Sequence, residues 1–148
     1  MSYKLVHPIA LICAFTWVGF VCAISFMEAW LKFRAMGVTL PIGLGIGRLV
    51  FNALNKVEWV LATAILVDLF WTRKLSLPLA YAALPLVILI TQTAWLLPAL
   101  DQRALLTLHG QNPGPSSLHF IYVAFEVIKV GALVLFGTKL VMPNTTEG

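Results

Sequence analysis

Four long runs of apolar residues divide this chain, and charged residues interrupt them at few positions. The runs extend from about 5 to 31, from 39 to 71, from 75 to 100 and from 118 to 141. Each run reaches the ~20 apolar residues that an α-helix needs to cross the hydrocarbon core of a membrane. The connections after the first two runs are short, which makes neighbouring helices antiparallel. The pattern therefore predicts an all-α fold: a polytopic membrane protein in which residues 1–148 form a single domain, an antiparallel bundle of four transmembrane helices.

The boundaries of the second and third helices are less obvious than the others. A glycine-rich stretch at 41–47 precedes the apolar core of the second run. It fits an extra helical turn, an interfacial segment or a short re-entrant piece. Because Pro41 suits the first turn of a helix, we expect one long, tilted helix. The connection at 101–117 contains two prolines and two glycines, so we expect an irregular loop there.

Composition supports a lipid environment. The chain is 60% hydrophobic and 11% charged, whereas soluble domains are about 25% charged. The net charge of +4 comes from basic residues scattered singly or in pairs, which argues against nucleic acid as a partner. We expect the lipid bilayer as the main partner, in a multi-pass protein of a bacterial-type inner membrane or its equivalent.

Polar residues form stripes along three of the predicted helices. An ionisable side chain in the middle of a transmembrane helix costs about 2.5–3.5 kcal/mol on insertion scales, so it normally faces the interior of the bundle. At 3.6 residues per turn, one face of the fourth helix carries His119, Tyr122, Glu126 and Lys129. A face of the first helix carries His7, Trp17, Ser25, Glu28 and Lys32. A face of the second helix carries Arg48, Asn52, Asn55 and Trp59, with Glu58 on its flank. The third helix offers Thr91, Gln92 and Thr93 near its centre.

Convergence of these stripes predicts a polar site inside the bundle. The candidate ligand-binding residues are Glu28, Lys32, Arg48, Asn52, Asn55, Glu58, His119, Tyr122, Glu126 and Lys129. We expect Glu28 to pair with Lys32, Glu126 to pair with Lys129, and Arg48 to pair with a neighbouring carboxylate. The structural alternative is an internally neutralised core that only fixes helix packing. No series of residues marks a catalytic site, a cofactor or a metal.

Chain topology separates the two histidines that begin apolar helices. His7 opens the first helix, and three crossings of the membrane bring the chain to His119 at the start of the fourth. The two histidines therefore belong to opposite membrane faces, about 30 Å apart. His119 should lie level with the end of the first helix. We expect a cluster of His119, Tyr122, Glu28, Lys32 and Arg48 on that side.

Short sequence features resemble the CopD-like small membrane proteins, a group that includes the HemJ-type protoporphyrinogen oxidases and uncharacterised four-helix families. The features are Leu5-Val6-His7 with Trp17-Val18-Gly19, Ser25-Phe26-Met27-Glu28, Pro41, and Leu118-His119. The resemblance implies a four-helix layout, and it implies that His7 is a candidate haem or metal ligand. The sequence Asn55-Lys56-Val57-Glu58 also resembles part of a motif of the glutathione-dependent MAPEG membrane enzymes. Phe51 stands where that motif has an arginine.

These observations lead to one functional hypothesis and two alternatives. The first is an integral membrane protein whose polar site inside the bundle binds a small ligand, cofactor or metal, with a redox or haem-related role. One alternative is a small proton-coupled transporter that uses the same charges as a relay. The other is a structural subunit, packed into a homo-oligomer or a larger membrane complex.

Overall fold

The computed structural model describes residues 6–71 and 76–141, and these residues form four long helical segments. The first segment consists of α1 (Pro8–Val21), the π-helical η1 (Cys22–Glu28), α2 (Ala29–Leu31) and the 3₁₀-helical η2 (Lys32–Arg34). The second is a single helix, α3 (Leu40–Trp71). The third consists of α4 (Ser76–Thr91), the π-helical η3 (Gln92–Leu96) and α5 (Leu97–Leu108). The fourth is α6 (Leu118–Val141).

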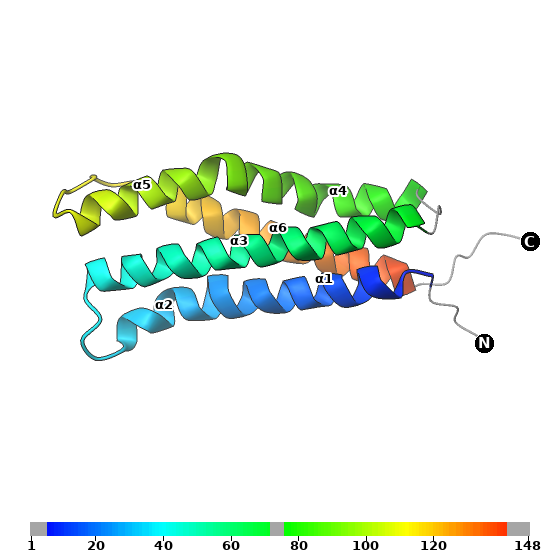
Figure 1. The fold of residues 1–148 in the computed structure, drawn as a ribbon, viewed down its shortest axis with the longest axis horizontal. Coiled ribbons are helices and arrows are strands. Elements are labelled where there is room, and N and C mark those ends of the chain that lie inside the picture. Colours follow the sequence, from blue (N-terminus) through cyan, green and yellow to red (C-terminus); the bar gives the residue numbers. More distant parts are fainter. Residues whose placement is uncertain (1–5, 72–75, 142–148) are drawn as a thin grey trace, which may run out of the picture.

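The four segments run antiparallel and form a closed bundle (Figure 1). The beginning of α1 and the end of α6 lie at one end of the bundle, and the turns between α2 and α3 and between α5 and α6 lie at the other. Contacts link α1 to α3, α3 to α5, α4 to α6 and α6 back to α1. Each segment therefore packs against two others around a common core. The predicted all-α antiparallel bundle is confirmed.

Apolar side chains cover both the inside and the outside of this bundle. The core holds small and large residues of α1 and α6, among them Ala10, Ala14, Leu133 and Phe136. Large apolar side chains such as Leu49 and Phe120 are 75% exposed on the outer surface. Such an exterior is stable in lipid and unstable in water. All four segments are long and apolar enough to span a membrane, so the chain is a multi-pass membrane protein.

The second segment is one continuous helix, as predicted. The glycine-rich stretch after Leu40 belongs to α3 and is neither a separate interfacial segment nor a re-entrant piece. A Cβ atom on Gly43 would overlap the ring of Phe33, so only glycine lets that aromatic side chain cross α3 so closely. With 32 residues, α3 is about 48 Å long. It therefore exceeds the hydrocarbon core of about 30 Å.

The third segment is longer than the sequence pattern predicted. The expectation of an irregular loop from residue 101 is wrong for the first eight residues, because α5 continues to Leu108. Gly110, with φ +77°, ends this helix. The amide of Gln111 donates to the carbonyl of Leu106 at 2.9 Å, and the amide of Gly110 donates to the carbonyl of Thr107 at 3.1 Å. This pair of bonds is a Schellman motif. The prolines of the connection thus follow a complete helix end. The expected helix starts at residues 5 and 75 lie outside the described residues.

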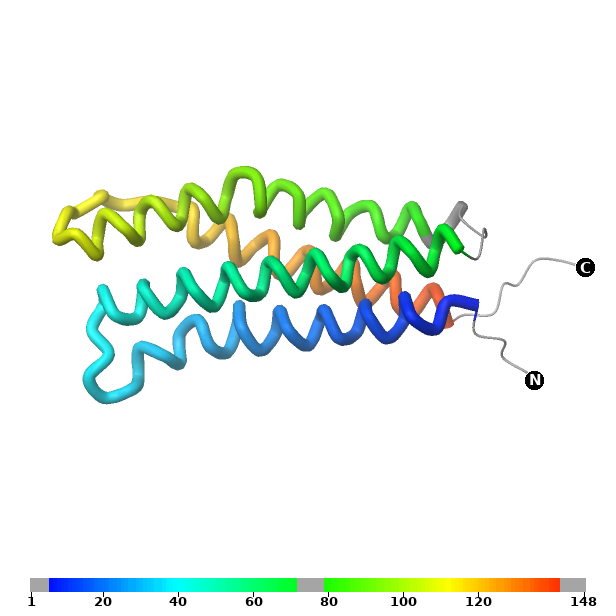
Figure 2. Tube along the Cα trace, in the orientation of Figure 1, coloured from blue at the N-terminus to red at the C-terminus, as the bar shows by residue number. Residues whose placement is uncertain are grey.

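Proline explains the irregular middle of the third segment. Pro98 has no amide hydrogen to donate to the carbonyl of Ala94, and its ring crowds that carbonyl. The helix widens to the π-helical η3 just before this point, which is how membrane helices accommodate the disturbance. The Cα trace of the third segment bends in the same region (Figure 2). The widened turn places Gln92 in the interior of the bundle.

A matched pair of glycines on α6 tests the packing of α6 against α1. A Cβ atom on Gly137 would lie 2.7 Å from the ring of Phe15, whereas a Cβ atom on Gly131 would meet nothing within 4 Å. We expect Gly137→Val to lower the free energy of unfolding by about 1–3 kcal/mol because it overpacks this contact. Gly131→Val, which carries the same change in helix propensity, should have little effect. Equal effects in reversible detergent-unfolding measurements would contradict this packing.

Candidate functional site

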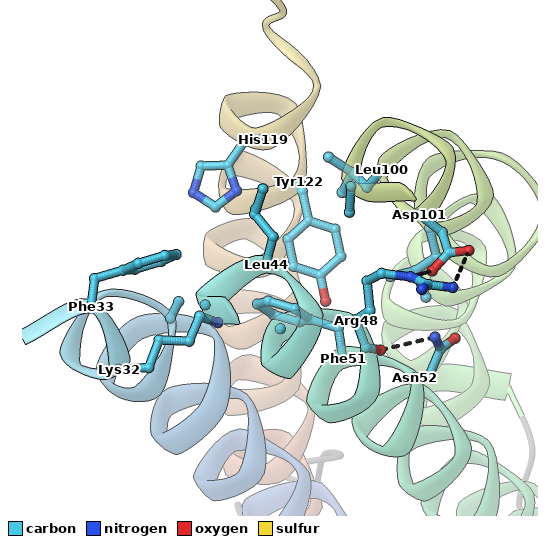
Figure 3. A pocket seen from close by; sticks show the side chains of 15 residues that line it. Lys32, Phe33, Leu44, Arg48, Phe51, Asn52, Leu100, Asp101, His119 and Tyr122 are labelled. Atoms are coloured by element: carbon cyan, nitrogen blue, oxygen red, sulfur yellow. Dashed lines mark hydrogen bonds and ion pairs between the residues drawn. The ribbon is translucent and has the colours of Figure 1, made fainter. Parts of the chain in front are cut away.

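A cavity opens at the end of the bundle where α2 turns into α3 and where α6 begins. Its volume is about 130 Å³. Five of the predicted polar residues line it, namely Lys32, Arg48, Asn52, His119 and Tyr122. The remaining wall is mostly apolar and includes Phe33, Leu44, Phe51, Leu97 and Leu100. We call this the end cavity. In Figure 3, His119 and Tyr122 project from α6 and Lys32 approaches from the first segment.

Lys32 supplies one positive charge to the end cavity. Its ammonium bonds to Glu28 at 3.2 Å, one helical turn earlier, which confirms that predicted pair. The same nitrogen lies 5.6 Å from the ring centre of Phe33 and 5.4 Å from that of Phe51. Aromatic faces attract cations, so the two rings help to hold the ammonium in place. An ammonium has three donors, and the bond to Glu28 uses only one.

Arg48 forms the opposite wall and is already neutralised. Its guanidinium makes a two-pronged ion pair with Asp101 of α5, with one contact at 3.0 Å. The predicted carboxylate partner of Arg48 therefore exists. It belongs to the part of the third segment that the sequence pattern assigned to a loop. This bidentate geometry fixes Arg48 in direction and ties α3 to α5 beside the cavity (Figure 3).

His119 and Tyr122 occupy different depths of the end cavity. His119 is exposed, whereas Tyr122 is 3% exposed and packs edge-on against Phe51, with ring centres 5.2 Å apart. The tyrosine hydroxyl points away from His119 and deeper into the bundle (Figure 3). There Tyr122 neighbours Ser25 and Glu126. Tyr122 thus lies between the end cavity and the interior of the protein.

A second group of polar side chains lies at the middle of all four segments. Lys129 is fully buried and donates to Glu126 at 3.0 Å, and it also forms an ion pair with Glu58. Trp17 donates its indole hydrogen to Glu58 at 2.8 Å, and Gln92 donates to Glu126 at 2.7 Å. We call these five residues the central cluster. The predicted pair of Glu126 and Lys129 is confirmed, and Glu58 joins it from α3.

Within the described part of the chain, three oxygen atoms around the central cluster have no hydrogen-bond partner. They are Oγ of Ser25, Oε1 of Gln92 and Oε2 of Glu126, all buried. Buried polar atoms are nearly always paired, so each exception requires a physical reason. Two of these residues, Ser25 and Gln92, belong to the π-helical segments η1 and η3. Such segments are frequent at functional sites.

The predicted polar stripe of α3 does not face the centre of the bundle. Asn52 is exposed and donates to the carbonyl of Arg48 in its own helix at 2.9 Å. Asn55 donates to Thr93 at 2.9 Å, and Trp59, 38% exposed, donates to the same hydroxyl at 3.0 Å. These bonds satisfy the side chains at the edge of the contact with the third segment. Glu58, placed on the flank of the stripe, is instead the residue that reaches the centre.

His7 lies at the opposite end of the bundle from His119, as the chain topology predicted. It is 4% exposed, and its Nδ1 lies 3.8 Å from a carboxylate oxygen of Asp68. The same oxygen accepts the backbone amide of Ala10 at 2.9 Å. A carboxylate from α3 therefore caps the start of α1. His7 does not line the end cavity, and its implied role as a haem or metal ligand stays a prediction.

The sequence pattern did not identify three interactions. These are the bond of Asp68 to the start of α1, the ion pair of Asp101 with Arg48, and the bond of Gln92 to Glu126. Depth along antiparallel helices could have indicated Asp101, because it lies about as far from the end of α5 as Arg48 lies from the start of α3. Asp68 lies within the last turn of α3, level with the start of α1. A comparison of depth along these two helices could therefore have indicated Asp68 as well. Across residues 6–71 and 76–141, no three His, Cys, Asp or Glu side chains gather as a metal site.

The central cluster predicts a large difference between partial and complete removal of its charges. Lys129→Met leaves two buried carboxyl groups without their counter-charge, and we expect a loss of about 3–5 kcal/mol in the free energy of unfolding. The triple change Glu58→Gln, Glu126→Gln and Lys129→Met removes every charge. The free energy of unfolding of this triple variant should be much closer to that of the unmodified protein. Detergent-unfolding curves measure both, and a triple variant as unstable as the single one would contradict charge pairing as the source of stability.

No protein-family model matches the chain, and neither a curated protein nor a solved structure matches it. The functions of the end cavity and the central cluster therefore have to be inferred from their own chemistry.

Proposed function

We propose that this multi-pass membrane protein binds a small molecule with an anionic group in the end cavity. The observation that carries the proposal is that one cavity brings together Lys32, Arg48 and His119, from three of the four segments. Ligand sites are concave and mostly apolar, with a few polar groups that converge on one region. The end cavity has this character.

Size limits the part of the ligand that is enclosed. A cavity of about 150 Å³ holds a benzene ring, and the end cavity has about 130 Å³. The enclosed part is therefore about as large as one six-membered ring. Phe33 and Phe51 supply aromatic walls for such a ring.

The available donors favour an anionic group on the ligand. Asp101 already occupies two donors of Arg48, so Arg48 acts mainly as a fixed wall. Lys32 keeps two unused ammonium hydrogens beside the cavity, and His119 supplies an exposed imidazole at its mouth. These two side chains would hold a carboxylate or a similar oxyanion.

The depth of the cavity suggests how a ligand would enter. Arg48 is eight residues from the start of α3, or about 12 Å along the axis. Because α3 exceeds the hydrocarbon core, this level corresponds to the boundary between acyl chains and headgroups. An amphipathic molecule accumulates at that boundary, with its apolar part toward lipid and its charge toward water.

A small proton-coupled transporter is the second candidate, and it is favoured by the charges of Glu58, Glu126 and Lys129 at the middle of the membrane. Intramembrane ionisable residues commonly mark ion and proton pathways. The relation to CopD-like proteins and a haem-related role remain proposals that rest on the sequence resemblance. An absorption spectrum and a metal analysis of the purified protein test them directly.

Three probes with the same ring and different charge test the anion preference. We expect benzoate to raise the thermal unfolding midpoint in detergent, benzyl alcohol to raise it less, and benzylamine not to raise it. A ligand at one hundred times its dissociation constant stabilises a protein by about 2.7 kcal/mol, which is measurable through tryptophan fluorescence.

A double variant and a matched control locate the binding of benzoate. Glu28→Gln with Lys32→Met removes an ion pair as a unit, and we expect it to abolish the response to benzoate. Lys56→Met removes an exposed lysine of α3 outside the cavity and should preserve the response. If no probe stabilises the protein, or if both variants respond equally, the end cavity is not an anion site and the structural-subunit alternative gains support.

A further inference from the structure

The central cluster contains one more acidic group than basic group. Glu58, Glu126 and Lys129 are each at most 1% exposed, and their ion pairs join them into one unit. The other members, Trp17 and Gln92, are neutral, as are the neighbours Ser25 and Tyr122. If both carboxyl groups were ionised, the cluster would carry one uncompensated negative charge. An unpaired charge in this environment costs several kcal/mol.

Position makes this excess charge especially unfavourable. Lys129 lies at the middle of α6, Glu58 near the middle of α3 and Gln92 near the middle of the third segment. The cluster therefore lies near the centre of the hydrocarbon core, about 15 Å from either surface. Water and dissolved ions cannot neutralise it from outside at that depth.

The hydrogen bonds around Glu126 show where a neutralising proton fits. Oε1 of Glu126 accepts hydrogen bonds from both Gln92 and Lys129, whereas Oε2 has no partner. A protonated carboxyl group has this asymmetry, because its carbonyl oxygen accepts and its hydroxyl donates. Glu58 also accepts both of its hydrogen bonds, from Lys129 and from the indole of Trp17, on one oxygen. Its second oxygen, however, is not one of the buried atoms that lack a partner, whereas Oε2 of Glu126 is.

Gln92 provides the acceptor for this proton. Its amide nitrogen already donates to Oε1 of Glu126, while its own oxygen is buried without a partner. A carboxylic acid and an amide can form a ring of two hydrogen bonds, N–H to carbonyl oxygen and O–H to amide oxygen. The first bond is present, and the two unpartnered oxygens belong to the same two side chains, as such a ring requires. A proton on Oε2 of Glu126 would pair both of them.

We infer that the central cluster is a proton-binding site in which Glu126 carries the proton on Oε2 and donates it to Gln92. One proton neutralises the excess carboxylate, so the site holds one positive charge on Lys129, one negative charge on Glu58 and a neutral Glu126. The inference concerns the resting protein and does not depend on any ligand in the end cavity.

Tyr122 gives this proton a route to the surface. Its ring lines the end cavity, and its side chain neighbours Glu126 and Ser25. The phenol can donate and accept a hydrogen bond, so it can pass a proton between water in the cavity and Glu126. In such an exchange, Glu126 releases a proton to the phenol oxygen while the phenol releases its own proton to water. Charge is conserved at every step.

Infrared spectroscopy of the full chain in lipid vesicles tests the inference. We expect the unmodified protein to show the carbonyl stretching band of a protonated carboxyl group, with a shift on exchange into D₂O. Glu126→Gln, which has nearly the same shape as the protonated acid, should lose this band. Glu58→Gln should lose it as well, because Glu126 then ionises to neutralise Lys129. Absence of the band in the unmodified protein would overturn the inference without the need for any variant.

The remaining outcomes separate the proton from its alternatives. A band whose frequency shifts in Trp17→Phe, which removes a donor to Glu58, and stays unchanged in Gln92→Leu, which removes a donor to Glu126, would overturn the assignment to Glu126. A band that appears only after sodium is removed would show that a sodium ion neutralises the cluster, which also overturns it. Tyr122→Phe should keep the band but slow its exchange in D₂O by about a hundredfold. Tyr81→Phe, a matched change on α4, should leave the exchange rate unchanged, and equal rates in both variants would overturn the proposed route.

Discussion

A lysine at the centre of a bilayer must be neutralised by the protein itself. Lys129 meets this requirement with Glu126 on its own helix and Glu58 on α3. Trp17 of α1 and Gln92 of η3 bind the same two carboxyl groups. All four segments therefore meet at one charge, which restricts how far any of them can slide or rotate. The apolar contacts around this point contribute packing, but many such arrangements exist, and the buried charges select one.

Charged side chains are completely paired at the centre of the bundle and only partly paired at its end. At the centre, every charged side chain is buried and bonded within the protein. At the end cavity, Lys32 has a single carboxylate partner that is 25% exposed, and His119 is exposed. This difference follows from the solvent, because headgroups and water can stabilise charges that acyl chains cannot. A binding site at the end can thus keep unused hydrogen-bond donors that would be too costly at the centre.

Helix count, helix direction and the inward face of α6 could be predicted from the sequence because each depends on a local pattern. Twenty apolar residues require a span, and a stripe containing Glu126 and Lys129 requires a buried face. Asp101 could not be assigned correctly, because a proline-rich connection conceals how far the preceding helix extends. Asn52 and Asn55 were misplaced for a different reason. An amide side chain satisfied within its own helix or by one threonine can lie at the edge of a contact, and helical periodicity alone does not distinguish the edge from the centre.

The π-helical turn at Cys22–Glu28 determines more than the position of Ser25. A wide turn accommodates one additional residue, and each residue rotates the rest of a helix by about 100°. Everything after this turn, including Lys32 and Phe33, therefore has its direction set by the number of residues within it. A related chain that lacked one residue here would keep the upstream half of this segment in register with α6. In that chain, the side chains equivalent to Lys32 and Phe33 would point away from the end cavity. The number of residues in this turn therefore determines which side chains are available to bind a ligand there.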